Sequence, residues 1–315
     1  MSAAPAAAAK DALPLPTRRL DRCLNCGAQD LRPLPLAYEF RGRFPAVRCP
    51  GCGLFFLAVQ PTAEGLAELY SAAYFESDFR CGRSEVAYAD EAAFRAENAG
   101  LLAAFDAIVP PGATPRRLLE VGCAGGWLLK HARERGWEVK GVELSADAAA
   151  RARALGLDVF HGDLAGAAYP AASFDLVYMG DVLEHVPDCR AVLAEVARVL
   201  VPGGRLFLRG PITTHSLARR LALGVCGATG RTIVLREPPY HLWEFRPASL
   251  ERLLEATGFR LDSMQQSKIP PGRTHGRKSP LERAAMLTLD AVNAPITAAL
   301  NAFGDRVQLV ARRDS

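Results

Sequence analysis

Residues 118–129 read LLEVGCAGGWLL, and this stretch decides the fold. Its first residues form a short apolar run that favours a buried strand, and the glycines that follow favour a tight turn into a helix. Small residues in such a turn let a ligand approach the backbone and the N-terminus of the next helix. A glycine turn after a strand is common in α/β proteins, so the rest of the pattern must show what this one binds.

From Arg116 onward, apolar strands alternate with amphipathic helices, which is typical of a parallel sheet with helices on both faces. The predicted strands are residues 116–121, 137–143, 158–163, 174–180, 205–211, 259–264 and 306–313. The predicted helices are residues 126–136, 145–156, 190–200 and 247–258, with one or two more within 279–304, where Pro295 predicts a break or kink. The sequence therefore predicts a doubly wound α/β fold.

Three of these strands end in or run into an acidic residue. Glu120 precedes the turn that contains Gly122, Ala124 and Gly126. Glu143 ends the next strand, where a carboxylate can accept hydrogen bonds from both hydroxyls of a ribose. Asp163 ends the third, where its side chain or the backbone amide of Leu164 can meet an adenine ring. Three spaced acidic strand ends indicate a nucleoside site at one edge of the sheet.

Five blocks, in this order and spacing, make the chain resemble the class I S-adenosylmethionine-dependent methyltransferases. They are EVGCAGG at 120–126, GVELS at 141–145, HGDL at 161–164, FDLVYMGDVLEHVPD at 174–188 and RAVLAEVARVLVPGGRLFL at 190–208. The resemblance implies a Rossmann-like, seven-stranded sheet whose last strand is antiparallel. It also implies that the methyl donor is bound by Glu120, Gly122, Gly126, Glu143, Leu144, Asp163, Leu164 and Asp181. Ala124 replaces the family's middle glycine, a departure that bears on affinity. A nicotinamide dehydrogenase shares the opening of the pattern, but MGDVLEHV and VLVPGG favour methyl transfer.

Four of the eight cysteines form two CxxCG knuckles separated by 22 residues. Each knuckle presents two thiolates to one metal ion, and the glycine permits the turn that directs backbone amides at the sulfurs. Tetrahedral zinc suits Cys23, Cys26, Cys49 and Cys52, and rubredoxin-type iron is the minor alternative. Four protein ligands leave no open position, so the predicted zinc is structural and stabilises a module too small to fold alone.

Two histidines are candidates for acid–base chemistry. Asp181, Glu184 and His185 follow the fourth strand, where this fold places its substrate edge, and His241 lies within PPYHLWEF at 238–245. Either imidazole can accept a proton near neutral pH. For His185, packing beside the cofactor is the simpler interpretation, whereas for His241 a lid residue and a packing residue are both open. A base is needed only if the acceptor is a hydroxyl or a protonated amine.

Composition sets the remaining expectations. Half of the 315 residues are hydrophobic, and the formal charge of +4 is spread along the chain, so nucleic acid is not the expected partner. The first residues lack the features of a signal peptide, and no apolar run is long enough to span a membrane, so we expect a cytoplasmic protein. The predicted organisation is a flexible tail (1–20), a zinc-ribbon-like module (21–60), a helical bridge (61–112) and the methyltransferase domain (113–315).

The predicted reaction is methylation of a small molecule or saccharide, the latter by analogy with similar methyltransferases that act on cell-surface saccharides or secondary metabolites. The segment 212–240 and the helices within 279–303 are expected to shape the acceptor pocket. Two alternatives stay open, a ribosomal RNA methyltransferase and a cofactor-binding protein without catalysis. The acceptor atom and the oligomeric state are not predicted.

Overall fold

The central sheet of the computed structural model has seven strands in the order β13-β14-β10-β9-β6-β7-β8. Residues 14–69, 90–108, 116–269 and 280–314 are described. The strands are β6 (Arg116–Val121), β7 (Trp137–Glu143), β8 (Asp158–His161), β9 (Phe174–Gly180), β10 (Leu200–Pro211), β13 (Phe259–Ser267) and β14 (Arg306–Arg313). β14 is antiparallel to both of its neighbours, and the other adjacent pairs are parallel. The predicted mostly parallel sheet with an antiparallel last strand is confirmed.

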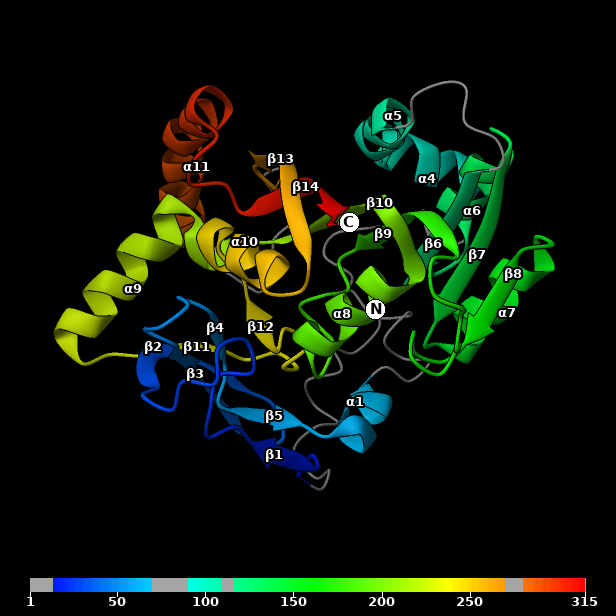
Figure 1. Cartoon of the computed structure of the whole chain (residues 1–315). Helices are drawn as coiled ribbons and strands as arrows, with labels where there is room; N and C mark the ends of the chain where they lie inside the picture. Colours follow the sequence, from blue (N-terminus) through cyan, green and yellow to red (C-terminus); the bar gives the residue numbers. More distant parts are fainter. Residues whose placement is uncertain (1–13, 70–89, 109–115, 270–279, 315) are drawn as a thin grey trace, which may run out of the picture.

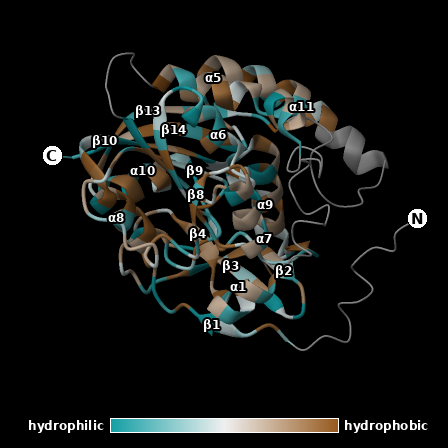
Figure 2. Cartoon of the chain, turned by 90° about the vertical axis from the view of Figure 1, so that its right-hand side faces the viewer, coloured by the Kyte–Doolittle hydropathy of each residue, from teal (hydrophilic) through white to brown (hydrophobic). Residues whose placement is uncertain are grey.

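Helices cover both faces of this sheet (Figure 1). On one face lie α5 (Ala99–Ile108), α6 (Trp127–Arg133) and α7 (Ala146–Ala154), and on the other α8 (Cys189–Val199) and α10 (Pro247–Glu255). Within β9, Leu176 and Tyr178 pack on the first side, whereas Val177 and Met179 pack on the second. A strand buried on both faces is apolar at most of its positions, which is why this central part of the sheet is largely hydrophobic (Figure 2).

A second sheet has the order β11-β2-β3-β4-β12 and draws on two distant parts of the chain. Its N-terminal strands are β2 (Arg32–Glu39), β3 (Arg43–Arg48) and β4 (Phe55–Leu57), and its outer strands are β11 (Ile233–Leu235) and β12 (Trp243–Glu244). A separate pair joins β1 (Thr17–Arg19) to β5 (Val59–Pro61). Residues 21–60 therefore share their sheet with the segment that follows β10, which no local pattern in the sequence indicated.

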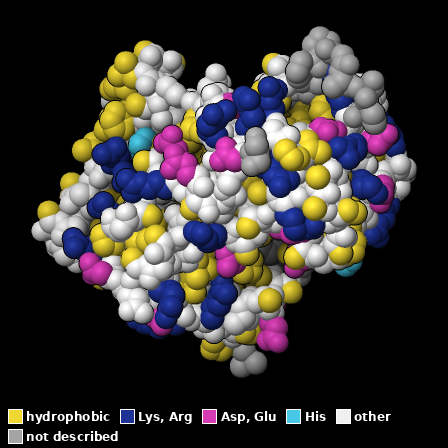
Figure 3. Space-filling model, viewed as in Figure 1, with side chains coloured by type: hydrophobic (Ala, Val, Ile, Leu, Met, Phe, Trp, Pro, Cys, Tyr) yellow, Lys and Arg dark blue, Asp and Glu magenta, His cyan; other side chains and the backbone are white. Residues whose placement is uncertain are grey.

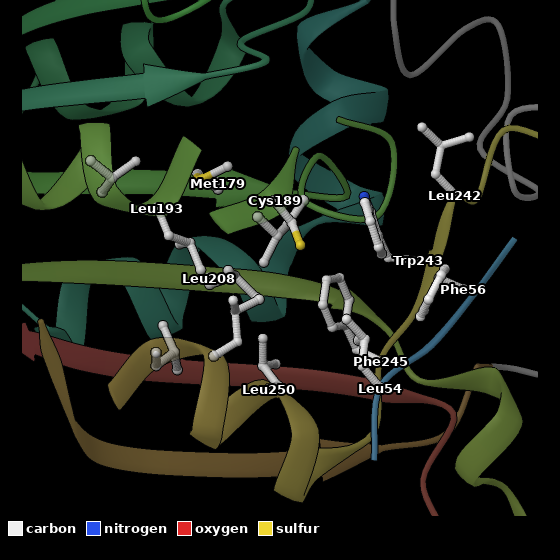
Figure 4. Close-up of a cluster of buried hydrophobic side chains, with 14 of the residues drawn as sticks. Leu54, Phe56, Met179, Cys189, Leu193, Leu208, Leu242, Trp243, Phe245 and Leu250 are labelled. Atoms are coloured by element: carbon white, nitrogen blue, oxygen red, sulfur yellow. The ribbon is translucent and has the colours of Figure 1, made fainter. Parts of the chain in front are cut away.

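The two sheets also share one hydrophobic core. Leu54 and Phe56 from the N-terminal sheet pack beside Trp243 and Phe245, and the same cluster continues to Cys189 on α8 (Figure 4). The rings of Phe56 and Trp243 lie 5.5 Å apart between centroids. Each fully buried side chain of this size stabilises the fold by about 1.5 to 3 kcal/mol, so separating the sheets would expose a large part of the core.

The remaining helices are α1 (Ala63–Leu69), α4 (Glu91–Glu97), the short η2 (Thr213–His215), α9 (Leu217–Thr229) and α11 (Pro280–Leu300). Of the break or kink predicted at Pro295, the break is wrong, because α11 continues through this residue. Asn293 and Thr297 are each 2% exposed, so this part of α11 packs on the rest of the protein, and the Asn293 amide donates to the Phe303 carbonyl. These contacts offset the one backbone hydrogen bond that proline removes from the helix. Residues 70–89, which include Cys81, and residues 109–112 of the expected bridge lie outside the described residues, as do residues 1–13 of the expected tail.

Candidate cofactor, acceptor and metal sites

The glycine turn after β6 has the backbone geometry that its residues predict. Gly122, Ala124 and Gly126 have φ angles of 74°, 47° and 81°, in the left-handed region. A Cβ atom at Gly122 would lie 2.4 Å from Val182 Cγ2, and one at Gly126 would lie 2.5 Å from Leu157 Cδ1, so neither position accepts a side chain. Ala124 adopts the same kind of backbone at a modest cost.

Glu143, at the end of β7, connects this turn to the second strand. It is 7% exposed, and its Oε2 and Oε1 accept hydrogen bonds from the backbone amides of Ala124 and Ser145, both at 2.8 Å. An ionised carboxylate has about four acceptor positions, so a carboxylate at this strand end can accept from backbone amides and also from a ligand donor such as a ribose hydroxyl. The geometry therefore suits a nucleoside.

The other predicted cofactor residues lie around this edge, and one of them, Asp181, is engaged by another side chain. Glu120 is 6% exposed beneath the turn, Leu144 is 54% exposed beside Glu143, and Leu164 is buried. Asp163 Oδ1 accepts from the Gly166 amide at 2.7 Å. Asp181, after β9, instead has both oxygens on Arg306 of β14, at 2.7 and 2.8 Å. The ion pair anchors Asp181 to the antiparallel strand.

The two candidate histidines meet at the carboxyl end of β9. Their rings lie edge to face, with centroids 4.9 Å apart. His185 Nδ1 donates to the Tyr240 carbonyl at 2.9 Å, which places its Nε2 3.5 Å from Oε1 of Glu184. Burial raises the pKa of Glu184 well above its usual range, with the Asp181 charge adding to the effect, and burial lowers the pKa of His185. Both shifts favour the uncharged forms of the two groups, the protonated carboxyl of Glu184 and the neutral imidazole of His185.

Glu184, His185 and His241 each place a donor atom within 4.8 Å of the other two. Two imidazoles and a carboxyl group at this spacing are a donor set that a divalent metal ion accepts. The sequence predicted the two histidines separately, but their meeting depends on how the segment 238–245 folds back onto β9. Its backbone is held there by a hydrogen bond from the Leu242 amide to the Glu184 carbonyl, 2.8 Å long.

Sequence reasoning missed two residues behind His241. Glu244, 5% exposed, lies with its Oε1 4.0 Å from His241 Nδ1. The same Oε1 accepts from the Tyr38 hydroxyl at 3.1 Å, and Oε2 accepts from Thr213 Oγ1 at 3.2 Å. Burial raises the pKa of Glu244, and the Arg219 charge and these two hydroxyl donors oppose the rise. Glu244 could have been found from the sequence, because it lies three residues after His241, whereas nothing in the sequence linked Tyr38 to this site.

The four knuckle cysteines form one cluster. All their sulfurs lie within 4.8 Å of one another, with Cys23 to Cys52 at 3.5 Å and Cys26 to Cys49 at 3.4 Å. These distances exclude disulfides and approach the edge of about 3.8 Å of a tetrahedron with metal–sulfur bonds of about 2.3 Å. A hydrogen bond from the Cys23 thiol lowers the pKa of Cys52 to about 5. The donor set fits a tetrahedral ion.

Comparison with known proteins shows the family. A family model described as a methyltransferase domain matches residues 92–264. The chain belongs to this methyltransferase family. A ubiquinone biosynthesis O-methyltransferase of Xanthomonas axonopodis pv. citri is 34% identical over 180 residues, covering 54% of this chain and 72% of the relative. One of Xylella fastidiosa (strain 9a5c) is 30% identical over 174 residues, covering 51% of this chain and 68% of the relative.

Among solved structures, an S-adenosylmethionine-dependent methyltransferase from Mesorhizobium loti is similar, with 21% identity and a TM-score of 0.46, over 67% of this chain and 96% of that one. The family match and the topology of the seven-stranded sheet identify the protein as an S-adenosylmethionine-dependent methyltransferase with the class I fold. Every helix in the described part of the methyltransferase is too short or too polar to cross a membrane. On the face shown in Figure 3, basic side chains lie in several groups with acidic ones between them.

Proposed function

We propose that this methyltransferase methylates a hydroxyl oxygen of a small molecule. The pairing of His185 with His241 at the carboxyl end of β9 carries the proposal, since it places imidazoles at the edge where this fold receives its acceptor. The names of the relatives, O-methyltransferases of ubiquinone biosynthesis, support oxygen as the acceptor atom. The comparisons give no specific support to the predicted saccharide.

His241 is the proposed base. It is the more exposed of the two histidines, with 22% of its side chain accessible against 16% for His185, and its Nδ1 faces the Glu244 carboxyl. When bound, S-adenosylmethionine supplies an electrophilic methyl group, and its sulfur keeps the electron pair of the broken carbon–sulfur bond. The acceptor oxygen forms the new bond to carbon as its own proton passes to the other ring nitrogen of His241, Nε2.

The cofactor residues keep the roles that the resemblance implies. Glu143 would accept from the ribose hydroxyls, Asp163 and the Leu164 amide would meet the adenine, and Glu120 with the glycine turn would lie near the methionine part. Support comes from the paired amide contacts of Glu143 and from the close packing at Gly122. For Asp181, contact with the donor is what the resemblance implies, and the Arg306 ion pair supports an additional role in shaping this edge.

The cysteine cluster is proposed to hold a structural zinc ion in a ribbon-like module of residues 21–60. Support comes from four converging sulfurs and from two matched turns, in which the Gly27 and Gly53 amides donate to the carbonyls of Cys23 and Cys49 at 2.8 and 2.9 Å. Bonded this way, the ion has no open position for substrate, so its contribution is to stability.

The test is incubation of the purified full chain with isotope-labelled S-adenosylmethionine and a panel of phenols, sugars and ribosomal RNA. We expect a gain of one labelled methyl group, on oxygen, in a phenol or another small hydroxyl compound. Label in ribosomal RNA would support the RNA methyltransferase instead. Tight binding of S-adenosylhomocysteine without methyl transfer to any acceptor would overturn the proposal in favour of a cofactor-binding protein.

A further inference from the structure

The segment that carries His241 is fixed between the two sheets. On one side, β12 pairs with β4, and the Leu57 amide donates to the Leu242 carbonyl at 3.0 Å. On the other side, the Leu242 amide donates to Glu184 and the Trp243 indole donates to the Val186 carbonyl at 2.7 Å. The N-terminal sheet therefore sets where this segment stands relative to β9.

A chain of side chains then runs from the N-terminal sheet to His241. Tyr38 on β2 is 4% exposed, and its hydroxyl reaches Oε1 of Glu244, the oxygen that faces His241 Nδ1. Thr213, after β10, holds the second oxygen. With both oxygens engaged by donors from different elements, the carboxyl plane of Glu244 has one orientation, and that orientation determines which oxygen faces the imidazole.

We propose that Tyr38 and Glu244 are positioning residues for methyl transfer: Tyr38 fixes the Glu244 carboxyl, and Glu244 orients the His241 ring, so that the N-terminal sheet supplies part of the acceptor site. This inference rests on the proposed role of His241 as the base. It assigns a function in the reaction to a part of the chain whose cysteines suggested stability alone.

The charge on Glu244 has a defined consequence for His241. A carboxylate 4.0 Å from Nδ1 favours the protonated imidazole that forms as the acceptor loses its proton. Because the site is buried, this interaction is screened less than it would be at the surface. The Tyr38 hydroxyl in turn favours the ionised Glu244, because a donor stabilises the charged form of a carboxyl group.

The experiment compares Tyr38→Phe and Glu244→Gln in the full chain, with Tyr169→Phe as the control. Like Tyr38, Tyr169 has a hydroxyl that donates a hydrogen bond inside the protein, in this case to the Gly141 carbonyl at 3.4 Å, but Tyr169 lies outside the acceptor side. We expect kcat to fall about 10- to 100-fold in the first two variants, with the S-adenosylhomocysteine affinity unchanged, and to stay near the wild-type value in the control.

The pH profile separates positioning from a general loss of structure. Glu244→Gln removes the negative charge, so His241 stays neutral to lower pH. The fall in kcat on the acid side of the profile, its acid limb, therefore shifts to lower pH. Tyr38→Phe makes Glu244 harder to ionise, which weakens the same stabilisation of protonated His241, so the fall in kcat at low pH also shifts to lower pH, but less far than in Glu244→Gln. Shifts in the same direction, the larger one in Glu244→Gln, are the expected result. Unchanged kcat in both variants, or limbs that do not move, would overturn the inference.

A second measurement needs no acceptor. NMR titration of the His241 ring in the S-adenosylhomocysteine complex should show a lower midpoint in Glu244→Gln than in the wild type. An unchanged midpoint refutes the coupling between Glu244 and His241. A lowered midpoint in a protein whose turnover does not depend on His241 refutes the proposed base while the coupling stands, so the two failures are distinguishable.

Discussion

Replacing Glu143 with alanine is the sharpest test of the cofactor edge. In the proposed complex each Glu143 oxygen accepts one backbone amide, from Ala124 or Ser145, and one ribose hydroxyl. Hydrogen bonds to a charged group contribute about 1.5 to 3 kcal/mol each. Water entering the space left by the side chain restores part of the ribose hydration. The expected net loss is therefore about 1.5 to 3 kcal/mol, or about 10- to 150-fold in Kd.

Isothermal calorimetry with S-adenosylhomocysteine measures this loss directly. Because alanine also removes the acceptors of two backbone amides, the melting temperature must be followed in parallel, and Glu143→Gln, which keeps one oxygen, should lose less affinity. Asp158→Asn on β8 is a matched control, since its ion pair with Lys140 is exposed and contributes little. If a folded Glu143→Ala variant binds with the wild-type affinity, the end of β7 is not the ribose site.

Three further outcomes are expected. Metal analysis of freshly purified protein should find one zinc ion per chain, and the Cys52→Ser variant should lose it. Chelation should lower acceptor turnover before it lowers cofactor affinity. A purified protein that contains neither zinc nor iron would refute the metal site. As pH rises from 5 to 8, the melting temperature of Glu184→Gln should rise relative to that of the wild type. Because the pKa of Glu184 is raised in the folded protein, the wild type loses free energy of unfolding above the pKa of the unfolded state. A constant difference in melting temperature would mean that Glu184 is ionised throughout. His241→Ala should reduce turnover about 100- to 10,000-fold and at least as much as His185→Ala, and near-full turnover in both would point to an acceptor that needs no base.

The parts of the fold that follow from local pattern were predictable. The apolar runs that became β6 and β9 are buried on both faces, and the left-handed turn needed glycine at Gly122 and Gly126. The cofactor edge follows from these strands, because their carboxyl ends must meet. The cysteine cluster was predictable for a similar reason, since each CxxCG knuckle is a local motif and two knuckles complete one tetrahedral set.

Long-range pairing was not predictable from the same patterns. β12 has two residues, Trp243 and Glu244, which is too short for any alternation to be seen, and its partner β4 lies near the other end of the chain. Pro295 likewise predicted a break or kink, and the break did not occur because tertiary contacts hold the helix on both sides of this residue. The meeting of His185 with His241 depends on this pairing, so the sequence supplied the acceptor-side residues but not their arrangement.

The same pairing explains why the cysteine cluster and the acceptor site belong to one unit. β4 begins three residues after Cys52, so the second knuckle fixes the start of the strand that pairs with β12. Leu242 on that segment is bonded to Leu57 on one side and to Glu184 on the other, so a shift of β4 moves the backbone next to His241. The two backbone amides that donate to Glu143 belong to Ala124 and Ser145, neither of which lies in the N-terminal sheet. We therefore expect a disturbance at the cysteines to affect the proposed proton transfer at His241 more than the proposed ribose binding at Glu143.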